Sequence, residues 1–288
     1  PILSPLHVHY MLRQLAKRPS FVKEIRLAKQ WCKAQKVYGA ESYIAGISGH
    51  VLDLLLIHYG TFEKLIRAMV RWKKPVVIDI EGHHKDATRA LNKAKLHSPL
   101  VIVDPLQPER NAAAALSPAM FTKMIQAAKD FVKKPTPSAF RITPLTEAAL
   151  RKQFAKQELI IVRATPLVAK RDVAGAKCKL AYDFITRQLK RHSFSASETD
   201  WEFTEKGAIM FWVLEKATLA KTMMVQGPPA QRKVDVRRFK EKHPRAFEKG
   251  RRWYAEEKRP FTRANKLVAA LVRLPEVASR VKRSVMKL

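Results

Sequence analysis

The segment KEIRLAKQWCKAQKVYGAESYIAGISGHVLDLLLIHYG, residues 23–60, carries the strongest folding signals of the chain. Apolar residues recur at helical spacing in its first part, so the lysines and arginines between them fall on other faces of the helix. Gly39 is expected to close this helix after Tyr38. Ser48 is the expected N-cap of a second, strongly apolar helix, which is expected to end at Gly60. A turn that leads into a helix N-terminus suits either a polar ligand or close packing.

The chain is strongly basic. Its 288 residues include 56 Lys and Arg against 25 Asp and Glu, a formal net charge of +31. This excess favours a nucleic acid as partner over a merely solvated basic surface. The only two cysteines, Cys32 and Cys178, lack metal-ligand spacing, which argues against a disulfide framework or a zinc site and fits a reducing cytoplasm. No apolar run reaches the roughly 20 residues that a bilayer-spanning helix needs.

The pattern of elements predicts an α+β protein in three parts. Residues 1–134 are expected to form a helical domain with a short β-hairpin, in which the runs Val76–Ile80 and Leu100–Val103 pair. The stretch KKPTPSAF, residues 133–140, is typical of a linker. Residues 135–225 are expected to form a small sheet with helices on one face. Residues 226–288 hold 19 Lys and Arg against 6 Asp and Glu and are expected to form a basic, helical tail.

Several segments in one order resemble the archaeal-type (class I) CCA-adding enzymes, tRNA nucleotidyltransferases that add the 3′-terminal CCA to tRNA. The resemblance is carried by KEIRLAK, VYGAE, GISGHVLDLLLIHYGTF, VVID, VIVDPLQPERNAAAALS and GRRWYAEEKRPFT. It covers nearly the whole chain, is weakest over residues 135–235, and begins partway along the family's sequence. It implies a neck, a body and a tail without the amino-terminal head, which in the family carries the catalytic carboxylates and their Mg²⁺.

The resemblance therefore implies ATP and CTP as substrates, tRNA as a partner bound by its acceptor arm and elbow, and a separate head chain. Alone, the chain is expected to bind tRNA but to add no nucleotide. The opening residues Ile2, Leu3 and Leu6 are expected to be apolar and exposed, and to form the dock for the head chain. Two other interpretations are an RNA-binding or chaperone module without catalysis and the RNA-binding part of a poly(A)-type polymerase.

The resemblance also assigns four nucleotide-binding residues. His7, Lys29 and Tyr38 match positions that bind the triphosphate, and Arg110 matches the residue that helps to select C or A. Lys29 and Tyr38 are nine residues apart and are expected on one helix, at different heights. The alternatives are a solvated lysine, a tyrosine that only closes the helix, and an arginine paired with Glu109 or Asp104. Asn111 is expected to tie the loop backbone.

Carboxylates suited to catalysis are not evident. The D-x-E sequence Asp79-Ile80-Glu81 follows Gly46-Ile47-Ser48 at too great a distance for the Gly-Ser and D-x-E arrangement of nucleotidyltransferases. It is therefore rejected as the metal site, and no metal ligand is assigned to this chain. The nearby His83, His84 and Asp86 are better explained as a polar loop. In the second helix of the opening segment, His50 and His58 stand where the family more often has aromatic residues.

The basic tail is where RNA contacts are expected. Its aromatic residues are read as core at helical spacing, and its cations are expected to face phosphates. The predicted tRNA-binding residues are Arg237, Arg238, Lys240, Arg245, Arg251, Arg252 and Arg259, and the aromatic residues are Phe239, Phe247, Trp253, Tyr254 and Phe261.

Overall fold

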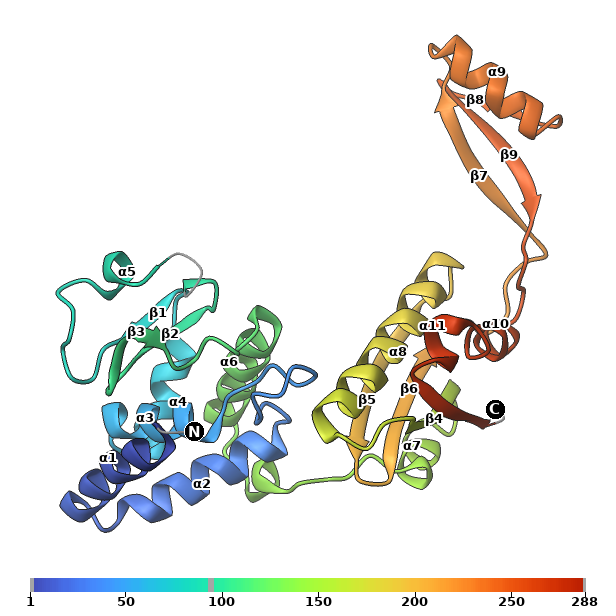
Figure 1. The fold of residues 1–288 in the computed structure, drawn as a ribbon. Coiled ribbons are helices and arrows are strands. Elements are labelled where there is room, and N and C mark those ends of the chain that lie inside the picture. Colours follow the sequence, from blue (N-terminus) through green and yellow to red (C-terminus); the bar gives the residue numbers. More distant parts are fainter. Residues whose placement is uncertain (1–2, 93–95, 287–288) are drawn as a thin grey trace. The chain divides into compact units, whose positions relative to one another are not determined.

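The structure, a computed structural model, describes residues 3–92 and 96–286 (Figure 1). Its contacts divide the chain into two compact units, Pro1–Pro144 and Leu145–Leu288, which are described separately. Within the described ranges, no helix is long and apolar enough to cross a membrane.

Five helices build the first unit around one apolar core. Their inward faces carry Trp31, Leu52, Leu55, Met69 and Met124, all fully buried. Ser48, Thr61 and Ser117 each precede a helix and accept a hydrogen bond from a backbone amide of its first turn, so the predicted N-cap at Ser48 is confirmed. The helices are α1 (Leu3–Lys17), α2 (Phe21–Ala34), α3 (Gly49–Tyr59), α4 (Phe62–Arg71) and α6 (Pro118–Lys133).

Helix α2 ends earlier than the sequence predicts. Its last helical residue is Ala34, and Lys36 adopts a positive φ of 55°, which turns the chain back. Tyr38 then pairs with Ile47 in a β-bridge, and Gly39, with φ 125°, lies in the turn after it. The prediction that Lys29 and Tyr38 share one helix is therefore wrong.

A small sheet completes the first unit. Strand β1 (Val76–Ile78) runs parallel to β2 (Leu100–Asp104), which pairs antiparallel with β3 (Gln107–Asn111). The two predicted runs thus pair, but the hairpin is formed by β2 and β3. A short helix, α5 (Ala87–Ala90), lies between β1 and β2 in sequence.

The predicted linker packs on the first unit. Residues Pro137–Phe140 form a 3₁₀ turn, and the carbonyls of Ala139 and Phe140 accept hydrogen bonds from Gln35 and Gln30. The ring of Phe140 also contacts two aromatic rings, the buried Phe62 and the half-buried Phe131. The division between the units therefore falls after Pro144, beyond the predicted boundary at residue 134.

The second unit contains an antiparallel sheet in the order β10-β4-β6-β5. On β4, Ile160 and Val162 face the core formed with α8, α10 and α11, whereas Ile161 packs on the opposite side with Leu150 of α7. The α+β class is confirmed, but helices cover both faces. The elements are α7 (Glu147–Gln153), β4 (Glu158–Pro166), α8 (Arg171–Arg191), β5 (Ala196–Thr204), β6 (Gly207–Leu214), α10 (Ala264–Leu271), α11 (Pro275–Ala278) and β10 (Val281–Met286).

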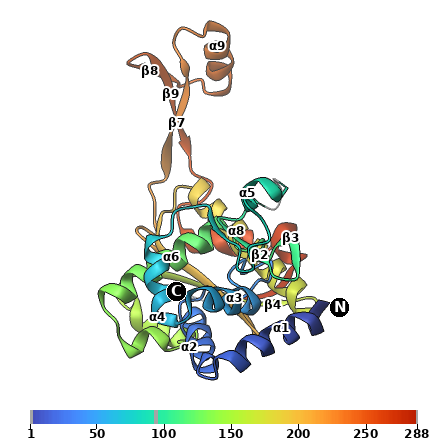
Figure 2. The same cartoon turned by 90° about the vertical axis from the view of Figure 1, so that its left-hand side faces the viewer.

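The basic tail is not simply helical, so that prediction is wrong. Strands β7 (Thr222–Pro229), β8 (Phe247–Lys249) and β9 (Arg252–Lys258) form a separate sheet in the order β7-β9-β8, and only α9 (Lys233–Lys242) is helical there. In both views α9 lies at one end of the β7–β9 ribbon (Figures 1 and 2). The apolar residues of α10, α11 and β10 pack into the core beneath α8, so the end of the chain rejoins the body.

Candidate functional site

Lys29 and Tyr38 meet at the N-terminus of α3 although they belong to different elements. A Cβ atom added at Gly49, the first residue of α3, would lie 2.8 Å from the Tyr38 hydroxyl and 3.8 Å from Lys29 Cε. The early end of α2 is what allows this, because the reversed chain brings Tyr38 back toward Lys29. An ammonium, a phenol and a helix N-terminus together form a surface suited to an anion.

Lys29 is paired with a carboxylate from α3. Its Nζ lies 3.3 Å from Asp53 Oδ1, and about a third of the Lys29 side chain is exposed. Burial raises the pKa of Asp53, and the nearby Lys29 opposes that rise. The ammonium is thus held near the helix N-terminus by Asp53, which argues against the interpretation of a merely solvated lysine.

His7 lies in a cluster around a fully buried carboxylate. Its Nε2 is 3.0 Å from both Oδ1 and Oδ2 of Asp104, whose side chain is 0% exposed. His50 Nε2 lies 3.9 Å from Asp104 Oδ2, and the two imidazole rings meet edge to face with centroids 4.6 Å apart. Burial, followed by the proximity of His7, lowers the pKa of His50, which favours its neutral form.

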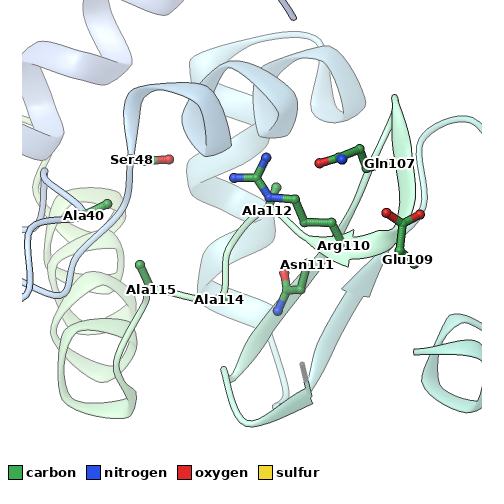
Figure 3. Close-up of a pocket in the computed structure, with 9 residues that line it drawn as sticks. All are labelled: Ala40, Ser48, Gln107, Glu109, Arg110, Asn111, Ala112, Ala114 and Ala115. Carbon is green, nitrogen blue, oxygen red and sulfur yellow. The ribbon is translucent and has the colours of Figure 1, made fainter. Parts of the chain in front are cut away.

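Arg110 lines a pocket of about 590 Å³ between the hairpin and the turn before α3. Its guanidinium extends from β3 toward the side of the pocket that holds Ser48 (Figure 3). It also lies 3.4 Å from Asp104 Oδ2 while its side chain is half exposed, so the predicted alternative of an ion pair with Asp104 is present. The lining residues are Ala40, Ser48, Gln107, Glu109, Arg110, Asn111, Ala112, Ala114 and Ala115.

Asn111 fixes the backbone of this pocket, as predicted. Its Oδ1 accepts hydrogen bonds from the amides of Ile102 and Ala113, at 3.0 and 2.9 Å, and its Nδ2 donates to the Leu100 carbonyl at 3.3 Å. Because every one of these bonds is buried, the segment that carries Arg110 has a rigid base.

The carboxylates of the D-x-E sequence take part in structural hydrogen bonds. Asp79 Oδ2 accepts from the His84 amide at 2.9 Å, and Glu81 Oε1 accepts from the Tyr10 hydroxyl at 2.6 Å. Burial together with this bond raises the pKa of Tyr10 well above its ordinary value. These contacts tie the two carboxylates to the loop after β1 and to α1.

The histidines after the D-x-E sequence belong to a polar loop, as predicted. His83 Nε2 lies 3.0 Å from the Pro105 carbonyl, and His84 Nε2 lies 2.8 Å from the Pro108 carbonyl. Since a carbonyl can only accept, each ring donates from Nε2 and fastens the loop to the β2–β3 hairpin.

Most of the predicted tRNA-binding residues of the second unit are exposed. Lys240 Nζ lies 3.8 Å from the centroid of the Trp253 ring, which places a cation on an aromatic face. Arg252 is half-buried and donates to the Gly227 carbonyl, and Arg259 is also half-buried. The Arg252 side chain thus also stabilises the fold locally. The exposed ones are Arg237, Arg238, Lys240, Arg245 and Arg251.

Sequence reasoning assigned no role in the site to three residues that lie in it, namely Gly49, His50 and Asp53. A signal existed, because His50 and Asp53 are the polar residues in the otherwise apolar first half of α3. Residues three apart share a helix face, so both point to the same side as Ser48 and Gly49. The polarity of these residues and their spacing therefore marked this face.

Comparisons with known proteins identify related sequences for both units. A family model described as the second domain of tRNA nucleotidyltransferase matches residues 23–141. A second, described as the C-terminal domain of CCA-adding enzyme, matches residues 175–287.

Three archaeal relatives bear the name CCA-adding enzyme. The one from Methanoregula boonei is 28% identical over 278 residues, which cover 93% of this chain and 58% of the relative. The one from Pyrobaculum aerophilum is 32% identical over 267 residues, 90% of this chain and 59% of the relative. The one from Aeropyrum pernix is 36% identical over 137 residues, 48% of this chain and 29% of the relative. The relatives from Methanoregula boonei and Pyrobaculum aerophilum thus match most of this chain, but the chain spans little more than half of their length.

Proposed function

We propose that this chain is a member of the CCA-adding enzyme family, since models of two domains of that enzyme match residues 23–141 and 175–287. As such it binds tRNA and forms part of the nucleotide pocket of a tRNA nucleotidyltransferase. The reaction would add CCA to the tRNA 3′ end from CTP and ATP. One observation carries the proposal, namely that Lys29, Tyr38 and the N-terminus of α3 converge at Gly49. The described part of the chain thereby offers a cation and a hydroxyl to a triphosphate.

The residues of this site have separable tasks. Lys29, held by Asp53, supplies charge to the phosphates, and the Tyr38 hydroxyl donates to a phosphate oxygen. Arg110 lines the neighbouring pocket and reads a base edge with its planar guanidinium. His7 was predicted as a third triphosphate contact, and to serve as one it must release Asp104.

Phosphoryl transfer also needs metal-held carboxylates, since Mg²⁺ prefers oxygen ligands. Asp79 and Glu81 follow Gly46-Ile47-Ser48 at too great a distance in the sequence for the Gly-Ser and D-x-E arrangement of nucleotidyltransferases, so this pair is not assigned that task. We therefore place the catalytic carboxylates on a separate head chain. Leu6 is half exposed, as its predicted part in the dock for that chain requires, whereas Ile2 lies outside the described residues and the Leu3 side chain is not described.

The experiment measures nucleotide addition to tRNA that lacks its CCA end, with Mg²⁺, CTP and ATP, in the presence and absence of an added head chain. We expect tRNA binding in both cases and addition only with the head chain. Addition by this chain alone would contradict the two-chain proposal and return attention to Asp79 and Glu81.

Lys29→Ala tests the phosphate role within the reconstituted enzyme. Because charge-assisted contacts are worth about 1.5–3 kcal/mol, the KM for CTP and for ATP should rise together by about tenfold or more. Lys23→Ala, which removes an exposed lysine of the same helix, is the matched control. A rise for only one nucleotide would mean that Lys29 senses the base.

A second candidate is an RNA-binding module without catalysis, which the exposed cations of α9 favour. It predicts tRNA binding that is indifferent to nucleotides and to a head chain. Tight tRNA binding with no addition under any of the conditions above would support it.

A further inference from the structure

Three metal-ligating side chains from three elements meet in the first unit. His7 comes from α1, His50 from the first turn of α3, and Asp104 from the end of β2. One ligand atom of each lies within 4.8 Å of the others. Within the ranges that the structure describes, this is the one such grouping of three or more histidine, cysteine, aspartate or glutamate side chains.

The ligand atoms of the three side chains lie close together. His7 Nε2 lies 3.0 Å from each oxygen of Asp104. His50 Nε2 is buried and has no hydrogen-bond partner, although it lies 3.9 Å from Asp104 Oδ2. A buried polar atom without a partner is costly, and a metal ion would satisfy it.

The carboxylate is fastened independently of such an ion. Asp104 Oδ1 accepts a hydrogen bond from the Leu106 amide at 3.0 Å, which orients it toward the two imidazoles. Support of a ligating carboxylate by a second hydrogen bond is a regular feature of protein metal sites.

We propose that His7, His50 and Asp104 form a binding site for one late first-row divalent cation, represented by Zn²⁺. The inference meets the proposed nucleotide function at one residue, because His7 is also a predicted triphosphate contact. His50 and Asp104 are not predicted nucleotide contacts, and metal binding is measured here without nucleotide.

Two imidazoles and one carboxylate select this class of ion. Zn²⁺ accepts nitrogen and oxygen ligands at about 2.0–2.2 Å in a tetrahedron, and three protein ligands leave the fourth position to water. Mg²⁺ and Ca²⁺ prefer oxygen ligands throughout, so this set is poor for them. The present N···O separations of 3.0 and 3.9 Å bracket the edge of such a tetrahedron, and small side-chain rotations suffice.

The net positive charge of the chain makes non-specific binding of a cation unfavourable, so a bound cation would indicate a specific site. The chain has a formal net charge of +31, which opposes adventitious binding of cations. Arg110 opposes it most closely, since its NH1 lies 3.4 Å from Asp104 Oδ2. Because the Arg110 side chain is half exposed, it can turn toward solvent when the cation binds.

The experiment is equilibrium dialysis of the full chain against Zn²⁺, with bound metal determined by elemental analysis. We expect about one Zn²⁺ per chain for the wild type. Loss of a group that only hydrogen-bonds to a metal ligand typically weakens metal binding about 10–100-fold. Loss of a ligand itself, in His50→Ala or His7→Ala, should therefore raise the dissociation constant for Zn²⁺ at least about tenfold. His9→Ala, an exposed histidine on the same helix as His7, should leave it unchanged.

Arg110→Ala supplies a test of opposite sign. It removes the competing cation and keeps all three ligands, so Zn²⁺ should bind several-fold more tightly. Cobalt absorption of the wild type gives a readout that needs no variant, because Co²⁺ in a tetrahedral site absorbs strongly in the visible range. Absence of a retained ion in the wild type, or equal retention in the wild type, His7→Ala and His50→Ala, would overturn the proposal.

Discussion

The imidazole of His50 makes stability depend on pH at the scale of one residue. Burial lowers its pKa, His7 and Arg110 lower it further, and the charge of Asp104 opposes them. A histidine with a lowered folded-state pKa binds protons more readily when unfolded. Its contribution to stability is therefore complete above the unfolded pKa and is lost as pH falls below it.

We expect the wild-type melting temperature to fall more steeply than that of His50→Gln between roughly pH 7.5 and pH 5.5, the range around the ordinary histidine pKa. Thermal unfolding in a chelating buffer measures the difference without interference from metals. His58 and His192 also have pKa values lowered by burial, and they contribute equally to both proteins. Parallel pH profiles would show that His50 is not protected from protonation.

Arg110 is predicted to read the nucleotide base. In the reconstituted enzyme, Arg110→Ala should reduce discrimination between CTP and ATP by about tenfold or more, the worth of one bidentate base contact. Its tRNA affinity should change little, because Arg110 belongs to the pocket of the first unit. Arg71→Ala, at an exposed position of the same unit, is the control. Equal losses of discrimination and tRNA affinity would instead indicate a structural ion pair with Asp104.

Local signals at single residues were predictable, and distant partners were not. Ser48 and Ser117 cap their helices through bonds to amides three residues away, which sequence spacing alone defines. The contact of His7 with Asp104 joins residues 97 positions apart, and only the fold brings them together. The sequence prediction for Arg110 found the residue but left its partner open between Glu109 and Asp104.

At the scale of elements, the N-terminus of α3 is the part of the site most sensitive to an added methyl group. A Cβ atom at Gly49 would lie 2.8 Å from the Tyr38 hydroxyl, so Tyr38 must shift. Gly49→Ala should therefore raise the KM for both nucleotides severalfold. Its melting temperature should change little, because alanine also favours the helix relative to glycine.

Tyr38→Phe gives the matched control for that change. Without the hydroxyl, the contact that Gly49→Ala disturbs is largely absent, so adding Gly49→Ala to Tyr38→Phe should have a much smaller effect than adding it to the wild type. Fully additive effects of the two substitutions on KM would show that the Tyr38 hydroxyl and Gly49 do not act together.

The end of α2 and strand β9 were predicted wrongly, because both depend on pairing with distant segments of the chain. The chain beyond Ala34 keeps a helix-compatible sequence, yet Tyr38 bonds to Ile47 in a bridge that local periodicity does not encode. Strand β9 carries charged residues on both sides because its sheet has little core, so it lacks the alternation by which strands are identified. Strand β9 is held by its antiparallel pairing with β7, which its own sequence pattern does not indicate.

At the scale of the whole molecule, charge is unevenly spread. Residues 226–288 hold 19 Lys and Arg against 6 Asp and Glu. The α+β class and the apolar helix between Ser48 and Gly60 were predicted from the sequence, whereas the return of α10, α11 and β10 to the body was not. An apolar helix pattern indicates that a face is buried, but not which core buries it.

This charge predicts that tRNA affinity depends steeply on salt. Lys and Arg that neutralise phosphates release condensed counterions, so the logarithm of affinity falls linearly with the logarithm of salt concentration. Each phosphate contact contributes about 0.7–0.9 to the slope. Replacing Arg237, Arg238 and Lys240 of α9 by alanine should therefore lower the slope by about two to three and weaken binding at low salt.

The decisive comparison keeps the net charge equal. Lys152, Lys156 and Lys170 are exposed residues of the same unit that lie outside the β7–β9 ribbon and α9, and their replacement by alanine removes the same three charges. If α9 contacts phosphates, the α9 variant loses slope and affinity while this second variant stays near the wild type, because screened charges act only over about 10 Å at 0.1 M salt. Equal losses in the two variants would show that tRNA senses the overall charge of the chain, and the assignment of α9 as a tRNA contact would then be wrong.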